Sequence, residues 1–525
     1  MRARAIMVLG TSSHVGKSLL TAALCRIFAQ EGYRVAPFKS QNMSLNSAVT
    51  PEGFEIGRAQ ALQAEAAGIL PTVHMNPILL KPMGNMTSQI VVRGKIWGKL
   101  TASDYHLRRV EELLPVVRES YEILAAQNDV IILEGAGSPA EINLKKHDIV
   151  NMRMAELADA ACLLVGDIDR GGVFASLFGT VALLDPHEQD RIHGFLINKF
   201  RGDVSLLEPG VRMIEERLNK PCLGVVPYLP QLTIDEEDSL GLPSPLSEHS
   251  EPWVISSDPA RPLRIAVIAL PSFSNFTDFD ALRAEPSVSL RFCRTAGQLA
   301  NADIVILPGS KQTADDLLWM RSEGLAPLLT DHARTGLVVG ICGGMQMLGE
   351  EIADPQGMER AGVILGLGLL PIHTTMQPQK VTRISSGQLI ATSLFSQPTP
   401  SVPISGYEIH IGETRYLEGA KPFAQLETES TADSLLDGCT AHEGRIFGSY
   451  LHGLFDDDNF RHIFLAAARA FYGLARDMSL NHWKQQREES LNRLADTVRA
   501  SLDMEQIFAC AGLSYSAQSN KETQS

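Results

Sequence analysis

The sequence predicts an α/β protein built from two doubly wound domains with mostly parallel sheets. Short apolar runs recur along the chain, and most are followed by a glycine-rich turn and a stretch with helical periodicity. This series breaks off once, where prolines and acidic residues replace the periodic pattern, and then starts again. We therefore expect a first domain over residues 1–228, a connection over 229–262, a second domain with C-terminal helices over 263–513, and a disordered polar tail over 514–525.

Composition excludes several classes of partner. The 525 residues include 46 Lys and Arg against 61 Asp and Glu, a formal net charge of −15, so we expect neither nucleic acid nor a membrane surface as a partner. Seven cysteines lie far apart without paired or zinc-type spacing, which predicts a reducing, cytoplasmic location. No apolar run is long enough for a signal peptide or a membrane span. The sequence does not determine the oligomeric state.

The first domain opens with a phosphate-binding loop. An apolar run over residues 5–9 predicts a strand, and a helical pattern follows over 19–30. Between them, glycine N–H groups can surround phosphate oxygens, a lysine can reach the β- and γ-phosphates, and a serine can bind Mg²⁺. The loop has five residues between its glycines, one more than usual. The predicted ATP-binding residues of this loop are Gly10, Thr11, Gly16, Lys17 and Ser18.

Two later strands end in polar residues that suit the same nucleotide. Glu134 follows the buried run 130–133, where a carboxylate can hold the Mg²⁺ that bridges phosphates, although capping a helix is the alternative. Asn198 ends another apolar run and is a candidate for base recognition, although asparagine also ends strands for local reasons. We predict Ser18 and Glu134 as the metal ligands.

Several polar side chains in the first half are candidates for binding an anionic substrate. They lie after strands, where ligands bind in open α/β sheets, or in irregular segments, and a solvated loop is the competing interpretation. Lysines in this set would hold substrate carboxylates, and an arginine would neutralise a transferred phosphoryl group. The candidates are Lys39, Gln41, Asn42, Asn46, Lys81, Asp169 and Arg170.

The second domain contains a pattern typical of a nucleophile elbow. An apolar run over residues 337–341 predicts a buried strand, and a helix opens at about residue 345, so Cys342 falls on the sharp turn between them. A position near a helix N-terminus favours the thiolate. A buried structural thiol is the alternative, since free cysteine is often buried. The residues predicted to bind glutamine or its oxyanion are Gly309, Gly343, Gly344, Met345 and Gln346.

A histidine is the expected partner of this cysteine. His452 ends an apolar run that begins near residue 446, and members of a catalytic triad need not be close in sequence. A single histidine at a strand end is more often structural, but the elbow makes His452 the best candidate for the base, with His410 second.

These motifs resemble known families. Gly340, Cys342, Gly344 and Gln346 with a distal histidine are similar to class I glutamine amidotransferases. The loop 10–18 with residues 134–137 is similar to the ATP fold of dethiobiotin synthetase. The fusion in this order resembles the cobyric acid synthase family, and the segments 38–43, 166–172, 198–203 and 406–410 strengthen the match. The resemblance implies glutamine-dependent amidation of the b, d, e and g side chains of adenosylcobyrinic acid a,c-diamide. Its substrates would be the corrinoid, glutamine and ATP, with Mg²⁺ and no prosthetic group.

One position departs from the wider class. Class I triads carry a glutamate two residues after the histidine, and Leu454 stands there in this chain. Glu408, Asp456 or water are the alternatives for orienting the histidine.

Two other functions are open at this point. One is amidation of a different acid, which would use the same two sites. The other is a partition-type ATPase, which Thr11 disfavours because such proteins usually carry a lysine there.

Overall fold

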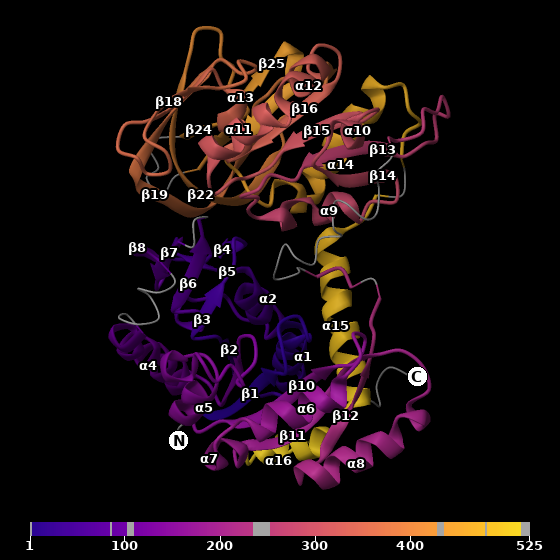
Figure 1. The fold of residues 1–525 in the computed structure, drawn as a ribbon. Coiled ribbons are helices and arrows are strands. Elements are labelled where there is room, and N and C mark those ends of the chain that lie inside the picture. The colour runs from indigo at the N-terminus through magenta and orange to yellow at the C-terminus, as the bar shows by residue number, and fades with distance from the viewer. Residues whose placement is uncertain are drawn as a thin grey trace. The chain divides into compact units, whose positions relative to one another are not determined.

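The computed structural model describes residues 3–83, 87–101, 110–230, 232–234, 252–427, 435–477 and 480–515 (Figure 1). The chain forms two compact units, each an α/β fold around a mostly parallel sheet, so the predicted fold class is confirmed. The first unit comprises Met1–Ser44, Glu55–Asp235 and Arg487–Ser525, and the second comprises Leu45–Phe54 and Glu236–Gln486. The predicted tail beyond residue 515 lies outside the described residues.

The first unit is organised around a parallel six-stranded sheet in the order β12-β11-β10-β1-β9-β2. The middle residues of its central strands are apolar because neighbouring strands and helices bury them. All carboxyl ends of these strands face one edge, where ligands bind in such folds. The strands are β1 (Arg4–Gly10), β2 (Val35–Phe38), β9 (Val130–Glu134), β10 (Ala161–Asp167), β11 (Ile192–Phe200) and β12 (Cys222–Pro227).

Helices and a smaller sheet surround this core. Helix α1 packs on β1, β2 and β9, and α6 packs on β10. The helices are α1 (Lys17–Gln30), α2 (Arg58–Ala66), α4 (Val110–Gln127), α5 (Met152–Ala158), α6 (Val173–Ala182), α7 (Pro186–Gln189) and α8 (Glu208–Leu218). The smaller sheet has the order β3-β6-β7-β8, with β3 (Gln41–Met43), β6 (Ile78–Pro82), β7 (Thr87–Val92) and β8 (Lys95–Thr101). Strand β5 (Glu55–Gly57) precedes α2.

The second unit has its own six-stranded sheet, in the order β14-β13-β15-β16-β26-β25. Only the pair β25–β26 in this sheet is antiparallel. The strands are β13 (Leu263–Ile268), β14 (Val288–Cys293), β15 (Ile304–Leu307), β16 (Leu337–Ile341), β25 (Cys439–Ala441) and β26 (Ile446–Ser449). The helices are η6 (Phe276–Phe279), α9 (Asp280–Arg283), α10 (Ala296–Leu299), α11 (Thr313–Ser322), α12 (Leu325–His332), α13 (Gly343–Leu348), η8 (Leu454–Asp456) and α14 (Asp458–Phe471).

A second, largely antiparallel sheet completes this unit. Two long strands, β19 and β22, pair along most of their length and bring residues 403–416 next to the end of β16. The strands are β17 (Glu351–Asp354), β18 (Gly362–Leu365), β19 (Ile372–Leu389), β22 (Pro403–Tyr416), β23 (Ala424–Leu426) and β24 (Leu435–Asp437), and a separate pair is formed by β20 (Ser393–Leu394) and β21 (Gln397–Pro398).

The domain ends differ from those expected. Most of α15 (Trp483–Ser501) and all of α16 (Met504–Cys510) belong to the first unit, not to the second. Figure 1 shows α16, in yellow, beside magenta elements of the first unit. The ring of Phe508 stacks on that of Phe28 with centroids 4.0 Å apart, and Leu494 and Val498 are buried in the same core as Ile6. These two helices belong to the first unit because their apolar side chains pack into its hydrophobic core.

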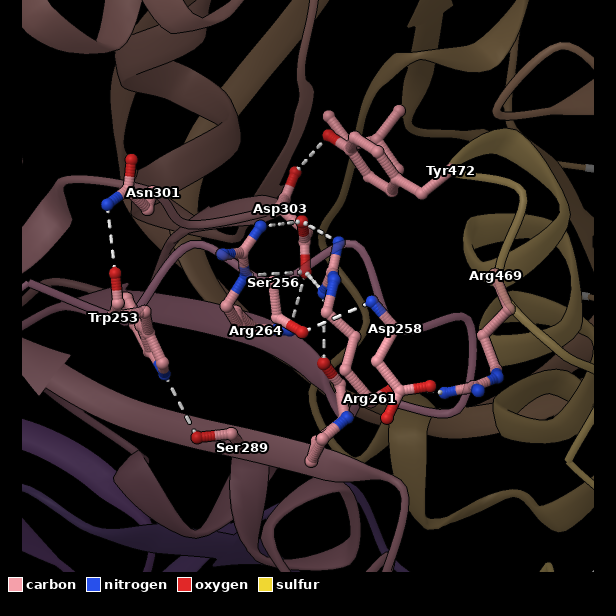
Figure 2. Close-up of polar contacts among 12 residues, drawn as sticks. Trp253, Ser256, Asp258, Arg261, Arg264, Ser289, Asn301, Asp303, Arg469 and Tyr472 are labelled. Atoms are coloured by element: carbon pink, nitrogen blue, oxygen red, sulfur yellow. Dashed lines mark hydrogen bonds and ion pairs between the residues drawn. The ribbon is translucent and has the colours of Figure 1, made fainter.

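The predicted connection is also shorter than expected. Ile234 is buried in the first core, and Trp253 is buried in the second. Figure 2 shows how the second stretch is anchored: Arg261 and Arg264 both bind the buried carboxylate of Asp303, and the Trp253 indole donates to the Ser289 hydroxyl at 3.0 Å. Residues 231 and 235–251 of this connection lie outside the described part of the chain.

Within the described ranges, no helix combines the length and the apolar character that crossing a bilayer requires.

Candidate active sites

Cys342 lies on a strained elbow, as predicted. It follows β16 directly and precedes the first residue of α13, with φ 52° and ψ −110°. A positive φ is unfavourable for any residue with a Cβ, and such strain is characteristic of positions that expose a reactive side chain. The backbone is held on both sides, because the Cys342 N–H donates to Ser449 O at 2.8 Å and its carbonyl accepts from Gln346 N at 3.2 Å. The residue is 6% exposed.

His452 lies beside this cysteine and is held by a carboxylate. Its Nδ1 is 2.7 Å from Oδ2 of Asp278, and both side chains are buried. The other carboxylate oxygen, Oδ1, accepts from the Gly453 N–H at 3.0 Å. Since an ionised carboxylate can only accept, Nδ1 carries the proton and Nε2 is left to exchange protons with the thiol.

The backbone of His452 is fixed as well. It exchanges two hydrogen bonds with Tyr407 of β22, at 2.8 and 3.0 Å, and the two rings stack with centroids 5.4 Å apart. A side chain at Gly406 could not fit, because its Cβ would lie 2.4 Å from the His452 carbonyl oxygen. The imidazole therefore has a defined orientation.

The electrostatics favour a charged histidine. Burial by itself would lower the pKa of His452, but the Asp278 carboxylate and the Cys342 side chain next to it outweigh burial and raise the pKa to about 10. An imidazolium at neutral pH stabilises a neighbouring thiolate. The arrangement is therefore that of a nucleophile, a base and an orienting acid.

The alternatives for these roles have other partners. Glu408 binds Arg383 through both oxygens, at 2.8 and 2.9 Å, and accepts from Ser385 at 2.5 Å. Although burial opposes it, hydrogen bonds from His410, Arg383 and Ser385 lower the pKa of Glu408 to about 2. The ring nitrogens of His410 face Gly412 O at 2.8 Å and Glu408 at 3.4 Å. Glu408 and Asp456 were wrong as orienting acids because Asp278 occupies Nδ1 of His452.

Glycines bring backbone N–H groups to the elbow. A Cβ at Gly309 would lie 3.0 Å from His452 Cε1, and one at Gly343 would lie 3.0 Å from Ser310 N, so the turn after β15 approaches both catalytic residues. At Gly344 a Cβ would meet Leu307 O at 2.0 Å. The first N–H groups of a helix have no partner within it, and α13 begins directly after Cys342. Gln346 and Met345 are buried behind it, and Gln346 Nε2 donates to the Tyr450 hydroxyl at 3.1 Å.

The first unit holds the phosphate loop between β1 and α1. Gly16 has φ 99° and caps α1, which glycine alone adopts without strain. The Lys17 ammonium donates to Ser12 O at 2.9 Å and to Gly137 O at 3.0 Å, so it lies inside the loop. When a nucleotide binds, the Lys17 ammonium can donate to phosphate oxygens in place of these two carbonyl oxygens.

Glu134 is the centre of the predicted metal site. The Ser18 hydroxyl and the Lys39 ammonium both donate to its Oε1 at 2.9 Å, and Gln63 donates to Oε2 at 2.6 Å. A hydroxyl and a carboxylate in contact beside a phosphate loop are the oxygen ligands that Mg²⁺ takes together with nucleotide phosphates. The residues therefore fit the ion.

Other expected ligands have structural contacts. The Asn198 amide donates to Val15 O of the loop at 2.8 Å, and a Cβ at Gly16 would lie 2.2 Å from its nitrogen. Asn198 therefore supports the loop in this structure, and the interpretation as a base-recognition residue is not needed to explain it. Thr11 donates its N–H to Val165 O at 2.9 Å and Gly10 pairs with Val165 in the sheet.

The substrate candidates separate into three groups. Lys39 and Lys81 are buried in ion pairs with Glu134 and Glu55, so neither is a cation of the surface. Asn42 donates to Gln60 at 3.2 Å, and Asp169 pairs with Arg201 at 2.9 Å. Gln41 is half-buried and Arg170 is exposed.

Asn46 differs from the other candidates because it belongs to the second unit, where its amide oxygen accepts from Phe276 N at 3.2 Å.

Asp278 was missed by the sequence interpretation. It lies ten residues after β13 ends, in the segment that leaves the edge of the sheet where β16 also ends. An acid after a parallel strand of the nucleophile's own sheet was the signal that could have identified it.

The two sites define a class of protein. Residues 264–460 match the family described as the CobB/CobQ-like glutamine amidotransferase domain, and residues 6–240 match the CobQ/CobB/MinD/ParA nucleotide binding domain. A glutamine-hydrolysing unit and a nucleotide-binding unit in one chain form an ATP-dependent amidating enzyme.

Relatives along the whole chain identify the family. The chain is 47% identical over 513 residues to the cobyric acid synthase of Moorella thermoacetica, with 97% of this chain and 98% of the relative covered. It is 48% identical over 509 residues to that of Yersinia enterocolitica, with 96% and 97% covered. The chain belongs to the cobyric acid synthase family, which excludes a partition-type ATPase.

Proposed function

We propose that this chain uses ATP and glutamine to amidate the b, d, e and g carboxylates of adenosylcobyrinic acid a,c-diamide. The observation that carries the proposal is the Asp278–His452 pair at 2.7 Å beside the strained Cys342, within a chain that also holds a complete phosphate loop. The relatives are named for their product, cobyric acid, and the family resemblance implies the a,c-diamide as the substrate.

In the second unit, the Cys342 thiolate attacks the carboxamide carbon of glutamine, and the oxygen gains negative charge. Backbone N–H groups at Gly309 and Gly343 stabilise that charge. His452 donates its Nε2 proton to the departing nitrogen, which leaves as ammonia, and a thioester forms on Cys342. His452 then takes a proton from water, the hydroxide attacks the thioester carbon, and glutamate leaves.

In the first unit, an oxygen of the corrinoid carboxylate attacks the γ-phosphorus of ATP, the bond to ADP breaks, and an acyl phosphate forms. Lys17 stabilises the charge on the transferring phosphoryl group. Ser18 and Glu134 would hold Mg²⁺, which supplies further positive charge to the phosphates. Ammonia attacks the acyl carbon and phosphate leaves, so that the side chain becomes a primary amide.

Lys39 and Gln63 have supporting roles in this proposal. Both donate to Glu134, at 2.9 and 2.6 Å, and thereby orient its carboxylate. We assign contacts with the corrinoid to Gln41 and Arg170, since Gln41 is half-buried and Arg170 is exposed, whereas the third accessible candidate, Asp169, carries a negative charge and pairs with Arg201. We also propose a cytoplasmic location, since none of the seven cysteines forms a disulfide.

The experiment compares nitrogen sources. Cys342→Ala should abolish amidation from glutamine and leave amidation from ammonium salts intact, because only ammonia release needs the thiolate. Cys293→Ala, at a buried thiol in the same sheet, is the control and should keep both activities. Loss of both activities in Cys342→Ala, with the control active, would contradict a separate glutaminase site.

A further inference from the structure

The segment Leu45–Phe54 belongs to the second unit, although its neighbours in sequence on both sides belong to the first. Strand β4 (Ser47–Val49) within it contacts β19 and β22 of the second unit. Residues 46–50 are all buried, whereas Glu52 near its tip is exposed. The segment is therefore a packed part of the glutaminase unit.

Two residues of this segment bind the start of η6. The Asn46 amide oxygen accepts from Phe276 N at 3.2 Å, and the Ser47 N–H donates to the Asn275 amide oxygen at 2.9 Å. Asn46 thus does for η6 what an N-cap side chain does for a helix, but from a distant part of the sequence. Asn46 is 2% exposed and Ser47 is fully buried, so water does not compete with these bonds.

The turn they hold leads directly to the orienting acid. Asn275 is in the left-handed conformation, with φ 54°, and its carbonyl accepts from the Asp278 N–H at 3.0 Å. The Asp278 carboxylate then bonds to His452 and to Gly453 N. Three hydrogen bonds therefore lead from Ser47 through Asn275 and Asp278 to the imidazole, and the bond from Phe276 N to Asn46 holds the same turn.

We propose that Asn46 is a positioning residue of the glutaminase site, which holds η6 so that Asp278 is aligned with His452. The inference rests on the function proposed above for Asp278 and His452. In this role Asn46 acts through the backbone of Phe276, whose N–H it binds. Small displacements of an orienting group are costly to catalysis because the base must approach the nucleophile at hydrogen-bond distance.

The test replaces the acceptor and then restores it. Asn46→Ala removes the oxygen that binds Phe276 N and should lower the kcat of glutaminase by about 10- to 100-fold, with the KM for glutamine within about twofold of the unmodified enzyme. Amidation from ammonium salts should be unchanged. Asn46→Asp keeps an acceptor oxygen at the start of η6 and should recover most of the lost kcat. Glu52→Gln, at the exposed tip of the same segment, is the matched control and should behave like the unmodified enzyme.

A double-mutant cycle tests the path. In the Asp278→Asn background, Asn46→Ala should cost less than about twofold further, because the group through which Asn46 acts is already disabled. Asn275→Gly is an independent variant, because glycine keeps the positive φ but lacks the oxygen that binds Ser47 N. It should reproduce the loss of kcat seen in Asn46→Ala.

Several outcomes would overturn the inference. A kcat for Asn46→Ala and Asn275→Gly within twofold of the unmodified enzyme, an equal loss in both backgrounds, or a parallel loss of ammonium-dependent amidation would each show that the segment is only structural. A different result would contradict the proposed function itself: Asp278→Asn would then retain normal glutaminase activity.

Discussion

Replacing Asp278 by asparagine removes the charge and one of two acceptors. Asp278 accepts from His452 Nδ1 at 2.7 Å and from Gly453 N at 3.0 Å. An asparagine offers a single oxygen, so one of these donors must face an amide NH₂ group. If the NH₂ group faces the ring, it stabilises the tautomer with the proton on Nε2, which cannot accept the thiol proton. If it faces Gly453, two donors oppose each other in a buried site.

The size of the effect follows from the pKa of His452. That pKa is raised from 6.5 to about 10 against the effect of burial, with Asp278 and Cys342 as the causes. Asp278 is the largest cause of this rise, so its loss costs on the order of a few kcal/mol of preference for the imidazolium, at 1.36 kcal/mol for each unit of pKa. The wrong tautomer adds to this loss, so we expect glutaminase kcat to fall by about 10² to 10⁴.

The assay is glutamate formation under saturating ATP and corrinoid, alongside amidation from ammonium salts. Asp278→Asn should affect only the first rate. Glu408→Gln is the control, because Glu408 binds Arg383 and Ser385 and should cost far less. A glutaminase rate for Asp278→Asn within about tenfold of the unmodified enzyme, or a larger loss in Glu408→Gln, would refute the assignment of the orienting acid.

Three further outcomes follow from the same contacts. Lys17→Ala should lower amidation by on the order of 10² or more with either nitrogen source, since charge in the transition state is left unmatched, and near-normal turnover would contradict its role. Alkylation of Cys342 by iodoacetamide, followed on its peptide by mass spectrometry, should stay fast from about pH 7 to 9 because the imidazolium persists below its raised pKa. In Asp278→Asn it should slow markedly as the pH falls toward about 7, because the imidazolium that stabilises the thiolate is weakened, and an unchanged profile would speak against coupling of the two groups. Arg461→Met leaves the Glu285 carboxylate buried without its ion-pair partner, so urea denaturation should show that the free energy of unfolding falls by about 3–5 kcal/mol. A second change, Glu285→Met, should restore part of this loss. Full stability of the single variant would be inconsistent with a stabilising role of this ion pair.

Local patterns predicted the parts of both sites that depend on neighbouring residues. The strand before Cys342 matches β16 at both ends, and the loop before α1 has the expected glycine conformation at Gly16. A buried parallel strand must be apolar, and a tight turn before a helix needs small residues, so both are visible within about ten positions. The same reasoning identified His452 and Glu134, because carboxyl ends of parallel strands share one edge.

What only the tertiary structure decided is which distant side chains meet. Asp278 reaches His452 across 174 positions of sequence, and Asn46 reaches Phe276 across 230. The position of Asp278 after a parallel strand makes it a candidate, but no local pattern shows which residue either side chain contacts, because a hydrogen bond between distant segments depends on the packing of whole strands and helices. The C-terminal helices are a similar case, since an amphipathic pattern shows that α15 has an apolar face but not which core buries it. The sequence by itself therefore determined the fold class, the elbow at Cys342 and the phosphate loop, whereas packing decided which carboxylate binds His452, the partner of Lys81 and the unit to which residues 45–54 belong.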